Sequence, residues 1–349
     1  MSQINTNAIL DASGGTTTSI NGLTPTVSNM AGRNRIINGD MRIDQRNAGA
    51  AVTGSNVYSV DRLLQVNNVA GCTYSVQQDS SAPQGFTNSL KVTITAAASP
   101  VNTTQVSLRQ YIEGFNTADL NWGTANAKTV TLSFWVKSSL TGTFGGAISN
   151  NAFDRTYAYE YTINSANTWE YKTVTIAGDT TGTWETDNSA GVRVFFGFGA
   201  TDYSKAAGVW DSAFAVQSTV SVDLCATNGA TWQITGVQLE AGSVATPFEH
   251  RMYGQELALC QRYYEYGYTS FYGYVASATS FNPDYIWTNQ FKVEKRATPT
   301  IVRSNVSDIR GIYDQRVIYT SGFESGFDIT DTGTPVGGAL FNFTASAEL

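Results

Sequence analysis

The sequence of 349 residues is short of charge, because Asp, Glu, Lys and Arg make up 14% of it. An average globular domain carries roughly 25%. The remaining polarity comes from Ser, Thr, Asn, Gln and Gly, which suit strands and turns better than exposed helices. Lys and Arg number 21 against 28 Asp and Glu, which gives a net charge of −7. A chain this acidic does not attract phosphate backbones, so we expect no nucleic acid partner.

Histidine and cysteine are also scarce, with one His and three Cys. Cys72, Cys225 and Cys260 are far apart in the sequence and show no Cys-x-x-Cys spacing, which argues against structural zinc. We interpret them as buried, reduced thiols of a protein made in a reducing cytoplasm. No apolar run reaches 18 residues and the first residues show no signal peptide pattern, so no membrane insertion is expected. We also expect no metal and no cofactor.

Residues 1–32 differ from the rest of the chain. Isolated apolar residues such as Ile9, Ile20 and Leu23 stand among Asn, Ser, Thr and Gly without a repeating period. Such a segment cannot bury its own apolar side chains and is either disordered or an extended arm on a partner. Pure linkers rarely carry Ile and Leu, which favours an arm for attachment or oligomerisation.

Short alternating strands predominate in residues 33–252. Residues 130–138 and 192–200 are apolar at every second position, as in strands with one buried face. Residues 220–224 are predicted as a further short strand. Strand-like runs between turns, with no helical pattern among them, predict an antiparallel jelly roll or β-sandwich.

A change of phase marks residues 231–239. Trp232 and Ile234 occupy even positions, whereas Val237 and Leu239 occupy odd ones. The change coincides with Gly236, which predicts a β-bulge at that residue.

One short connecting helix is predicted at residues 253–264, where Leu257, Cys260 and Tyr264 share a face. It leads into a smaller C-terminal β domain, residues 265–349. The predicted strands of that domain are 269–276, 291–295, 298–304, 316–320 and 339–349. No internal repeat of 20–50 residues is present, which argues against a β-helix or a propeller. The fold class is therefore all-β.

Six segments resemble bacteriophage tail-fibre and virion structural proteins that contain a carbohydrate-binding-module-like jelly roll. They are RNRIINGDMRIDQR (33–46), YSVDRL (58–63), TLSFWVKSS (131–139), WQITGVQLEAGSVATPFEHRMYGQELALCQRYY (232–264), KRATPTIV (295–302) and SAEL (346–349). The resemblance covers roughly residues 33–349. It implies a virion protein, assembled in the host cytoplasm as a homotrimer, and it carries over no catalytic residue.

Enzymatic chemistry has few candidate residues. Glycoside cleavage needs two facing carboxylates, and Asp154 with Glu160, or Glu185 with Asp187, would supply them. Glu160 lies on the polar side of its predicted strand, and the second pair lies in a predicted loop. The lone His250 has no nucleophile elbow near it. We therefore expect no enzyme.

Ligand binding has better candidates. Exposed Trp or Tyr rings can stack on sugars, and Trp169, Trp184 and Trp210 lie near predicted loops or strand ends. Asp328 and Asp331 form the most oxygen-rich stretch, but they lack calcium-loop spacing and are interpreted as a turn.

The hypothesis that follows is a fibre-type virion protein. It attaches to other virion proteins of the tail or capsid through residues 1–32 and presents β modules to a host surface glycan. The alternatives are a capsid decoration protein with a purely structural role and, less favoured, a polysaccharide depolymerase. Six aromatic residues crowd the C-terminal domain and predict contacts between subunits. They are Phe271, Tyr272, Tyr274, Phe281, Tyr285 and Trp287.

Overall fold

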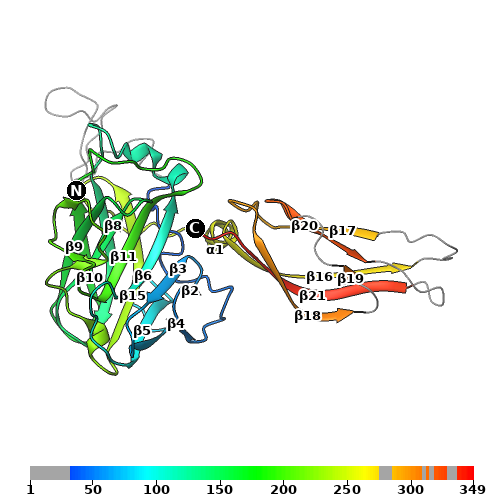
Figure 1. Cartoon of the computed structure of the whole chain (residues 1–349), viewed down its shortest axis with the longest axis horizontal. Coiled ribbons are helices and arrows are strands. Elements are labelled where there is room, and N and C mark those ends of the chain that lie inside the picture. The colour runs from blue at the N-terminus through cyan, green and yellow to red at the C-terminus, as the bar shows by residue number, and fades with distance from the viewer. Residues whose placement is uncertain (1–31, 275–284, 309–311, 314–317, 328–335) are drawn as a thin grey trace, which may run out of the picture.

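Two β modules follow one another along the chain, with a short helix between them (Figure 1). In this computed structural model, the described residues are 32–274, 285–308, 312–313, 318–327 and 336–349. The predicted arm, residues 1–32, lies outside them except for Gly32. The described elements are strands apart from one α-helix and three 3-10 turns, so the all-β prediction is confirmed.

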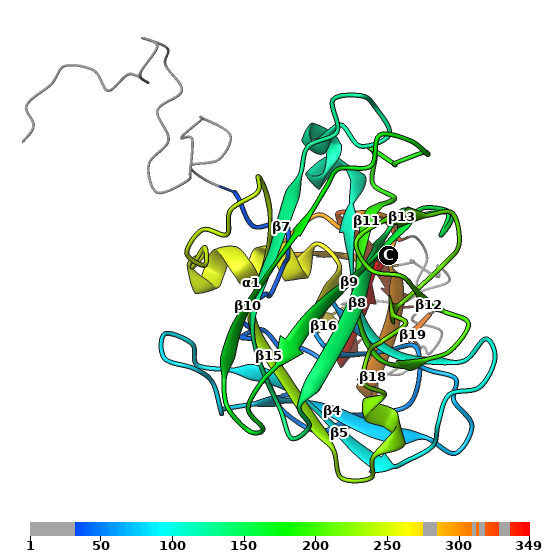
Figure 2. The same ribbon diagram turned by 90° about the vertical axis from the view of Figure 1, so that its left-hand side faces the viewer.

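The first module is a sandwich of two sheets (Figure 2). The six-stranded sheet has the order β1 (Val52–Thr53), β4 (Thr73–Asp79), β5 (Ser89–Ala96), β15 (Thr231–Ala241), β7 (Val130–Ser138) and β10 (Glu170–Ile176). The seven-stranded sheet has the order β13 (Trp210–Asp211), β9 (Thr156–Ile163), β8 (Gly142–Ser149), β11 (Ala190–Ala200), β6 (Gln105–Glu113), β3 (Leu63–Asn67) and β2 (Val57–Val60). The remaining elements are a short parallel pair, β12 (Ser204–Lys205) with β14 (Gln217–Ser218), and the 3-10 turns η1 (Gly114–Asn116), η2 (Ala118–Leu120) and η3 (Leu224–Ala226).

The core of this module lies between the two sheets and follows the predicted alternation. In β7 and β11 the alternating apolar residues are all buried, among them Leu132, Phe134 and Phe196. The strand predicted at residues 220–224 is wrong, because Val220 is exposed and Leu224 begins η3. The segment makes a single backbone hydrogen bond to β8 instead, from the Val222 amide to the Thr143 carbonyl at 2.7 Å, and is not itself a strand.

Gly236 forms the predicted β-bulge in β15. Thr235 pairs with Trp135 of β7, and the next pair is Gln238 with Ser133, so β15 carries one extra residue there. Gly236 has φ +63°, and a Cβ on it would lie 2.7 Å from the Phe86 ring. The glycine is therefore required both by backbone conformation and by space.

Helix α1 (Tyr253–Gln261) is followed by the C-terminal module. The helix ends three residues before the predicted limit, because Tyr264 is already the first residue of β16. The module has two three-stranded sheets, one of β16 (Tyr264–Tyr274), β21 (Val336–Ser346) and β18 (Thr300–Asp308), the other of β17 (Tyr285–Gln290), β20 (Gly322–Phe327) and β19 (Ile312–Tyr313). Its described core is small and consists of Phe291, Ile301, Phe323, Phe341, Phe343 and Ala345.

The predicted C-terminal strands are partly correct. β21 is the central strand of its sheet, and Phe341 and Phe343 are buried as expected. The strand predicted at residues 291–295 is wrong. The buried Lys295 donates to Glu265 at 2.7 Å and to the Gln261 carbonyl at 2.6 Å. These bonds hold residues 291–295 in an irregular conformation.

Membrane crossing by a helix has no support in the described part of the chain, where no helix combines sufficient length with sufficient apolar character.

Replacing Gly236 by Ala should lower the free energy of unfolding by about 2 to 4 kcal/mol, because the left-handed backbone and the contact with Phe86 both oppose a Cβ. The matched control is Gly254→Ala, since a Cβ at that helical position meets nothing within 4 Å. The control should leave stability unchanged or raise it by up to about 1 kcal/mol. Urea titrations of both variants measure the difference, and equal effects would contradict the role of the bulge.

Candidate functional site

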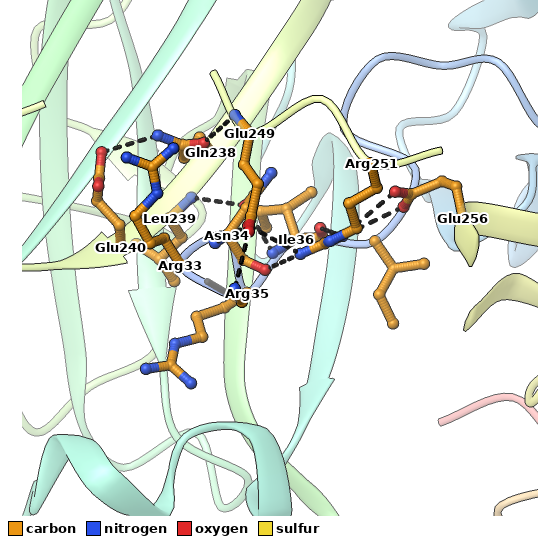
Figure 3. A network of polar contacts seen from close by, with 12 residues as sticks. Arg33, Asn34, Arg35, Ile36, Gln238, Leu239, Glu240, Glu249, Arg251 and Glu256 are labelled. Atoms are coloured by element: carbon orange, nitrogen blue, oxygen red, sulfur yellow. Dashed lines mark hydrogen bonds and ion pairs between the residues drawn. The ribbon is translucent and has the colours of Figure 1, made fainter. Parts of the chain in front are cut away.

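The segment that starts at Gly32 is fastened to the end of β15 by a polar network (Figure 3). The Asn34 side chain donates to the Val237 carbonyl at 3.0 Å and accepts from the Leu239 amide at 3.1 Å. The Arg35 amide donates to the Leu239 carbonyl at 2.9 Å. Residues 34–39 are not a strand, but they are hydrogen-bonded to β15 at the end where β5 no longer pairs with it.

Glu249 holds the same segment from the other side. Its carboxylate accepts from the backbone amides of Gly32 and Asn34, both at 2.8 Å, and lies 3.6 Å from Arg251. Arg251 in turn donates to the Asn34 and Ile36 carbonyls and pairs with Glu256 at 3.3 Å. Burial alone would raise the pKa of Glu249, but the amides and Arg251 outweigh it and lower that pKa. We call residues 32–39, 237–239 and 249–256 the clamp.

A second polar cluster joins the two modules. Glu348 pairs with Arg46 and with Arg62, whose side chain is almost fully buried. The Arg62 guanidinium lies 3.4 Å above the Tyr263 ring, a cation–π contact. Arg296 donates to the Ala347 carbonyl at 2.8 Å and to the Glu348 carbonyl at 3.0 Å. Five of the six segments that resemble virion proteins therefore meet in the clamp or at this junction.

The sixth such segment, residues 131–139, contributes Trp135 to an aromatic pocket on the outer face of the six-stranded sheet. Trp135 of β7 and Tyr171 of β10 are register partners, with ring centroids 5.4 Å apart. Gly236 lies beside Trp135, and Phe86 stands over the bulge. The cavity measures about 410 Å³ and is lined by Gln84, Gly85, Phe86, Ser133, Trp135, Tyr171, Gly236, Ala245, Thr246, Pro247, Phe248 and His250.

The pocket suits a neutral, partly apolar ligand. None of its lining residues is an acid, a lysine or an arginine. Tyr171 is 43% exposed, so one aromatic face is open to solvent. The ring centroid of His250 lies 4.9 Å from that of Phe248 and 5.4 Å from that of Phe86, so His250 is part of an aromatic wall. Aromatic rings beside a few amide and hydroxyl groups are typical of sugar-binding sites.

Trp184 and Trp210, two of the predicted sugar platforms, pack together with the buried Trp122. The three ring centroids lie 4.6 to 5.5 Å apart in edge-to-face contacts. Each indole N–H donates to a backbone carbonyl. Trp122 donates to Lys128, Trp184 to Thr181 and Trp210 to Ala177. The two residues are half-buried, and Trp184 lines a smaller cavity of about 150 Å³.

Trp169, the third predicted platform, lies away from that cluster, just before β10. The Lys137 ammonium stands 5.0 Å from its ring centroid. Lys137 follows Trp135 by two residues on β7, so both point to the outer face of the sheet. Trp169 and the aromatic pocket therefore occupy the same side of the first module.

The candidate catalytic carboxylates do not face one another across the aromatic pocket. Asp154 accepts a hydrogen bond from Asn150 at 2.6 Å, and Glu160 is exposed on β9, as predicted. Asp187 accepts from the Ser189 amide at 2.7 Å, which lowers its pKa. Glu185 lines the smaller cavity. Asp328 and Asp331 lie outside the described residues, and the described residues contain no group of three or more His, Cys, Asp or Glu that could hold a metal ion.

An uncharged apolar face covers the outer side of the β16–β21–β18 sheet. Register places Tyr266, Thr344 and Val302 in one row, and Tyr268, Asn342 and Ser304 in the next. The exposed large apolar residues here are Tyr266, Tyr268, Val302, Val306 and Leu340, between 41% and 58% exposed. Arg303 points to the opposite side, 5.5 Å from the Phe341 ring. We call this surface the outer face of the C-terminal module.

The aromatic residues that predict subunit contacts are only partly described. Trp287 is 48% exposed. The side chains of the others lie outside the described residues, namely Phe271, Tyr272, Tyr274, Phe281 and Tyr285.

Comparison with known proteins gives no family model and no curated protein that matches the chain. Among solved structures, the enzymatically active domain of tailspike protein 4 of bacteriophage CBA120 is 14% identical with a TM-score of 0.30, over 60% of this chain and 21% of that one. A family 11 carbohydrate-binding module of Clostridium thermocellum, in complex with a β-1,3-1,4-mixed-linked tetrasaccharide, is 14% identical with a TM-score of 0.29, over 57% and 98%. The N-terminal cellulose-binding domain of Cellulomonas fimi β-1,4-glucanase C is 14% identical with a TM-score of 0.25, over 58% and 94%. This chain thus spans about a fifth of the tailspike chain, and no residue role follows from likenesses at this level.

Replacing Glu249 by Gln should lower the free energy of unfolding at pH 7 by about 1 to 3 kcal/mol, because charge-assisted hydrogen bonds to the clamp are lost. The pKa of Glu249 is lowered on folding, so its contribution is complete above the ordinary value of 4.5 and disappears as the pH falls through the lowered value. The difference in free energy of unfolding between wild type and variant should therefore decrease below pH 4.5.

Denaturant titrations between pH 3 and pH 7 measure this gap. The control is Glu160→Gln, because that carboxylate is exposed on β9 and should change little at any pH. A Glu249→Gln effect that stays constant down to pH 3 would contradict a role for the charge.

Proposed function

We propose that this protein is a non-enzymatic structural component of a bacteriophage virion whose first β module binds glycan. The observation that carries the glycan proposal is the aromatic pocket of Trp135, Tyr171 and Phe86 on the open side of the six-stranded sheet. The virion assignment rests on the resemblance of residues 33–349 to phage fibre proteins.

The ligand best suited to this pocket is a neutral oligosaccharide. Sugar rings present apolar C–H faces that stack on aromatic rings, and their hydroxyls bond to neutral amides and hydroxyls. The pocket offers the rings of Trp135 and Tyr171 for the first role, and Gln84, Ser133 and His250 for the second. An anionic sugar would find no cation among the lining residues.

Binding without cleavage follows from the placement of the carboxylates. Glycoside hydrolysis needs an acid and a second carboxylate on opposite sides of the bond. The aromatic pocket is lined by neither, and His250 is packed between phenyl rings. The protein would then hold a glycan and leave its length unchanged.

Attachment to the particle is proposed for residues 1–32, in contact with tail or capsid proteins. The clamp fixes the start of the described chain at Gly32, so tension on the arm would be transmitted to β15 through Glu249. The alternative role, capsid decoration, needs the same attachment but no glycan. Imaging of virions labelled at this protein distinguishes a tail position from a shell position.

A homotrimer is proposed, with the outer face of the C-terminal module as the contact between copies. The module has a core of only six described apolar residues and exposes five more on one face. Small sheets need further burial for stability, and a partner that is always present supplies it. The exposed apolar residues of that face carry no charge, so no like charges would be brought into direct contact there. The number three comes from the resemblance to phage fibre proteins.

Replacing Trp135 by Ala should weaken retention on an immobilised glycan about tenfold, because the loss of one stacking ring removes about 1.4 kcal/mol of binding free energy. The assay uses a panel of bacterial surface polysaccharides and neutral β-linked oligosaccharides. Trp184→Ala is the matched control, since it changes a tryptophan in the other cluster. Trp169→Ala measures whether the binding surface continues along β10.

The outcomes of this assay separate the rival functions. Loss of retention in Trp184→Ala alone would move the site to the tryptophan cluster. Absence of retention by the wild type would favour the decoration role. Polysaccharide that becomes shorter during incubation, by size-exclusion chromatography, would contradict the non-enzymatic proposal.

The double substitution Tyr268→Asp and Val302→Asp should convert the oligomer into monomers, because it places like charges in the contact between copies. Multi-angle light scattering at micromolar concentration measures the mass. The control is Val220→Asp, which charges a residue that is 61% exposed on the first module and should leave the mass unchanged. A wild-type protein that is monomeric at this concentration would overturn the trimer.

A further inference from the structure

A second cavity lies in the C-terminal module, between the edge strands of its two sheets. Among the described strands, β16 pairs with β21 alone and β17 with β20 alone, so each forms one edge of its sheet. The cavity measures about 460 Å³, similar to the aromatic pocket of the first module, and it is lined by Glu265, Gly267, Tyr268, Thr269, Trp287, Thr288, Asn289, Gln290, Lys292 and Phe343. We call this cavity the C-terminal groove. Its volume is typical of sites for small ligands.

Aromatic rings supply the apolar part of the groove. Phe343 is the register partner of Gly267, and a Cβ on that glycine would lie 2.3 Å from the Phe343 ring. The glycine thus allows the ring to lie directly on β16, where it is almost fully buried. Trp287 lines the groove from β17 and is half exposed. A buried ring beside a partly exposed indole gives a flat apolar surface on which a sugar ring can stack.

Neutral polar groups line the groove beside these rings. The Thr269 hydroxyl donates to the side-chain oxygen of Asn289, a hydrogen bond that links the two sheets. The Asn289 side chain is buried, and its amide nitrogen lies 3.5 Å from the Ser325 hydroxyl. A hydrogen bond of that length is weak, so the amide can still donate to a ligand. Gln290 adds a second amide to the lining.

The charges at the groove are unequal. Glu265 is buried, and its carboxylate is 2.7 Å from the Lys295 ammonium and 3.1 Å from the Lys292 amide. Its charge is therefore balanced within the protein. Lys292 is exposed, and its ammonium makes no ion pair with an acid in the described part of the chain. One cation is thus left for a ligand, whereas the aromatic pocket of the first module is lined by none.

We propose that the C-terminal groove is a second saccharide site, which takes a sugar residue that carries a carboxylate. The sugar ring stacks on Trp287, its hydroxyls bond to Asn289 and Gln290, and its carboxylate faces the Lys292 ammonium. A rim lysine adds a modest attraction that salt screens, so it selects among sugars more than it tightens binding. The two modules then prefer different sugars. This inference does not depend on the aromatic pocket of the first module.

The groove also gives Trp287 a role other than the predicted contact between subunits. Trp287 belongs to the β17 sheet, whereas the outer face of the C-terminal module belongs to the β16 sheet. Tyr268 borders both surfaces, so the groove opens beside the proposed contact between copies. In the proposed homotrimer, three grooves would act together. Linked sites bind a polymer far more tightly than one site does, so weak binding at each groove is sufficient.

The test measures retention of the full-length protein on immobilised bacterial polysaccharides that contain uronic acids. Each polysaccharide is also used after chemical reduction of its carboxylates to hydroxymethyl groups, so that the two forms differ in charge alone. The wild type should bind the acidic form about fivefold more tightly than the reduced form. This preference should decrease at high salt, because an exposed ammonium is screened.

The variants assign that preference to the groove. Trp287→Ala should weaken retention on the acidic form about tenfold, because a stacking surface is lost. Its matched control is Tyr319→Ala, which removes a ring of the same module that is 46% exposed and lies outside the groove. Lys292→Gln should lower retention on the acidic form to that on the reduced form, whereas Lys128→Gln, at an exposed lysine of the first module, should keep the preference. Trp135→Ala should also keep it.

Equal retention of the wild type on the acidic and reduced forms, or none on either, would overturn the proposal. So would a preference that survives both Trp287→Ala and Lys292→Gln. A lower mass of Trp287→Ala in light scattering would identify the groove as a contact between copies instead. Loss of all retention in Trp135→Ala would contradict the second site and leave the first-module proposal intact. Because Lys292 is exposed, its variant keeps the test decisive even where Trp287→Ala does not fold.

Discussion

The pairing of residues 34–39 with the end of β15 is the constraint on which the rest of the fold depends. It joins segments about 200 residues apart. The Asn34 side chain bonds to the Val237 carbonyl and the Leu239 amide, and two backbone bonds, Arg35 to Leu239 and Val237 to Gly39, complete the pairing. Glu249 and Arg251 then satisfy the remaining amides and carbonyls of the segment. Because buried backbone groups need partners, loss of this arrangement would leave several unsatisfied at once.

The clamp and the aromatic pocket share the loop that follows β15. Thr246 and Pro247 line the pocket, and both accept hydrogen bonds from Arg33 of the clamp. Thr246 is also held by Glu240, at 2.6 Å from its hydroxyl. Hydrogen bonds to the clamp and to β15 therefore hold this wall of the pocket, and a wall that is held before binding lowers the ordering cost of binding.

Periodicity predicted the parts of the fold in which one face is buried and the other is not. The alternation in β7 and the phase change at Gly236 are local, so the bulge could be placed from sequence alone. The same alternation put Trp135 on the outer face of β7, which was the available signal for the pocket. The pocket itself could not be predicted, because Phe86, Tyr171 and His250 come from three distant segments. The strand prediction at 220–224 was wrong because alternation does not reveal whether a strand has a partner. The packing of Trp184 and Trp210 on Trp122 could not be predicted, because it is a contact between segments distant in the sequence.

The contact of Glu348 with Arg46 and Arg62 has a consequence for biosynthesis. On the ribosome, Arg62 emerges long before its counter-charge, and until Glu348 follows it has no carboxylate to offset its burial. The junction between the modules can therefore close only after β21 has been translated, however early the first sheets form. Contacts at such sequence separation slow folding and prolong the time during which apolar surface is exposed. Translation rate and chaperone supply in the producing cell would then influence the yield of folded protein.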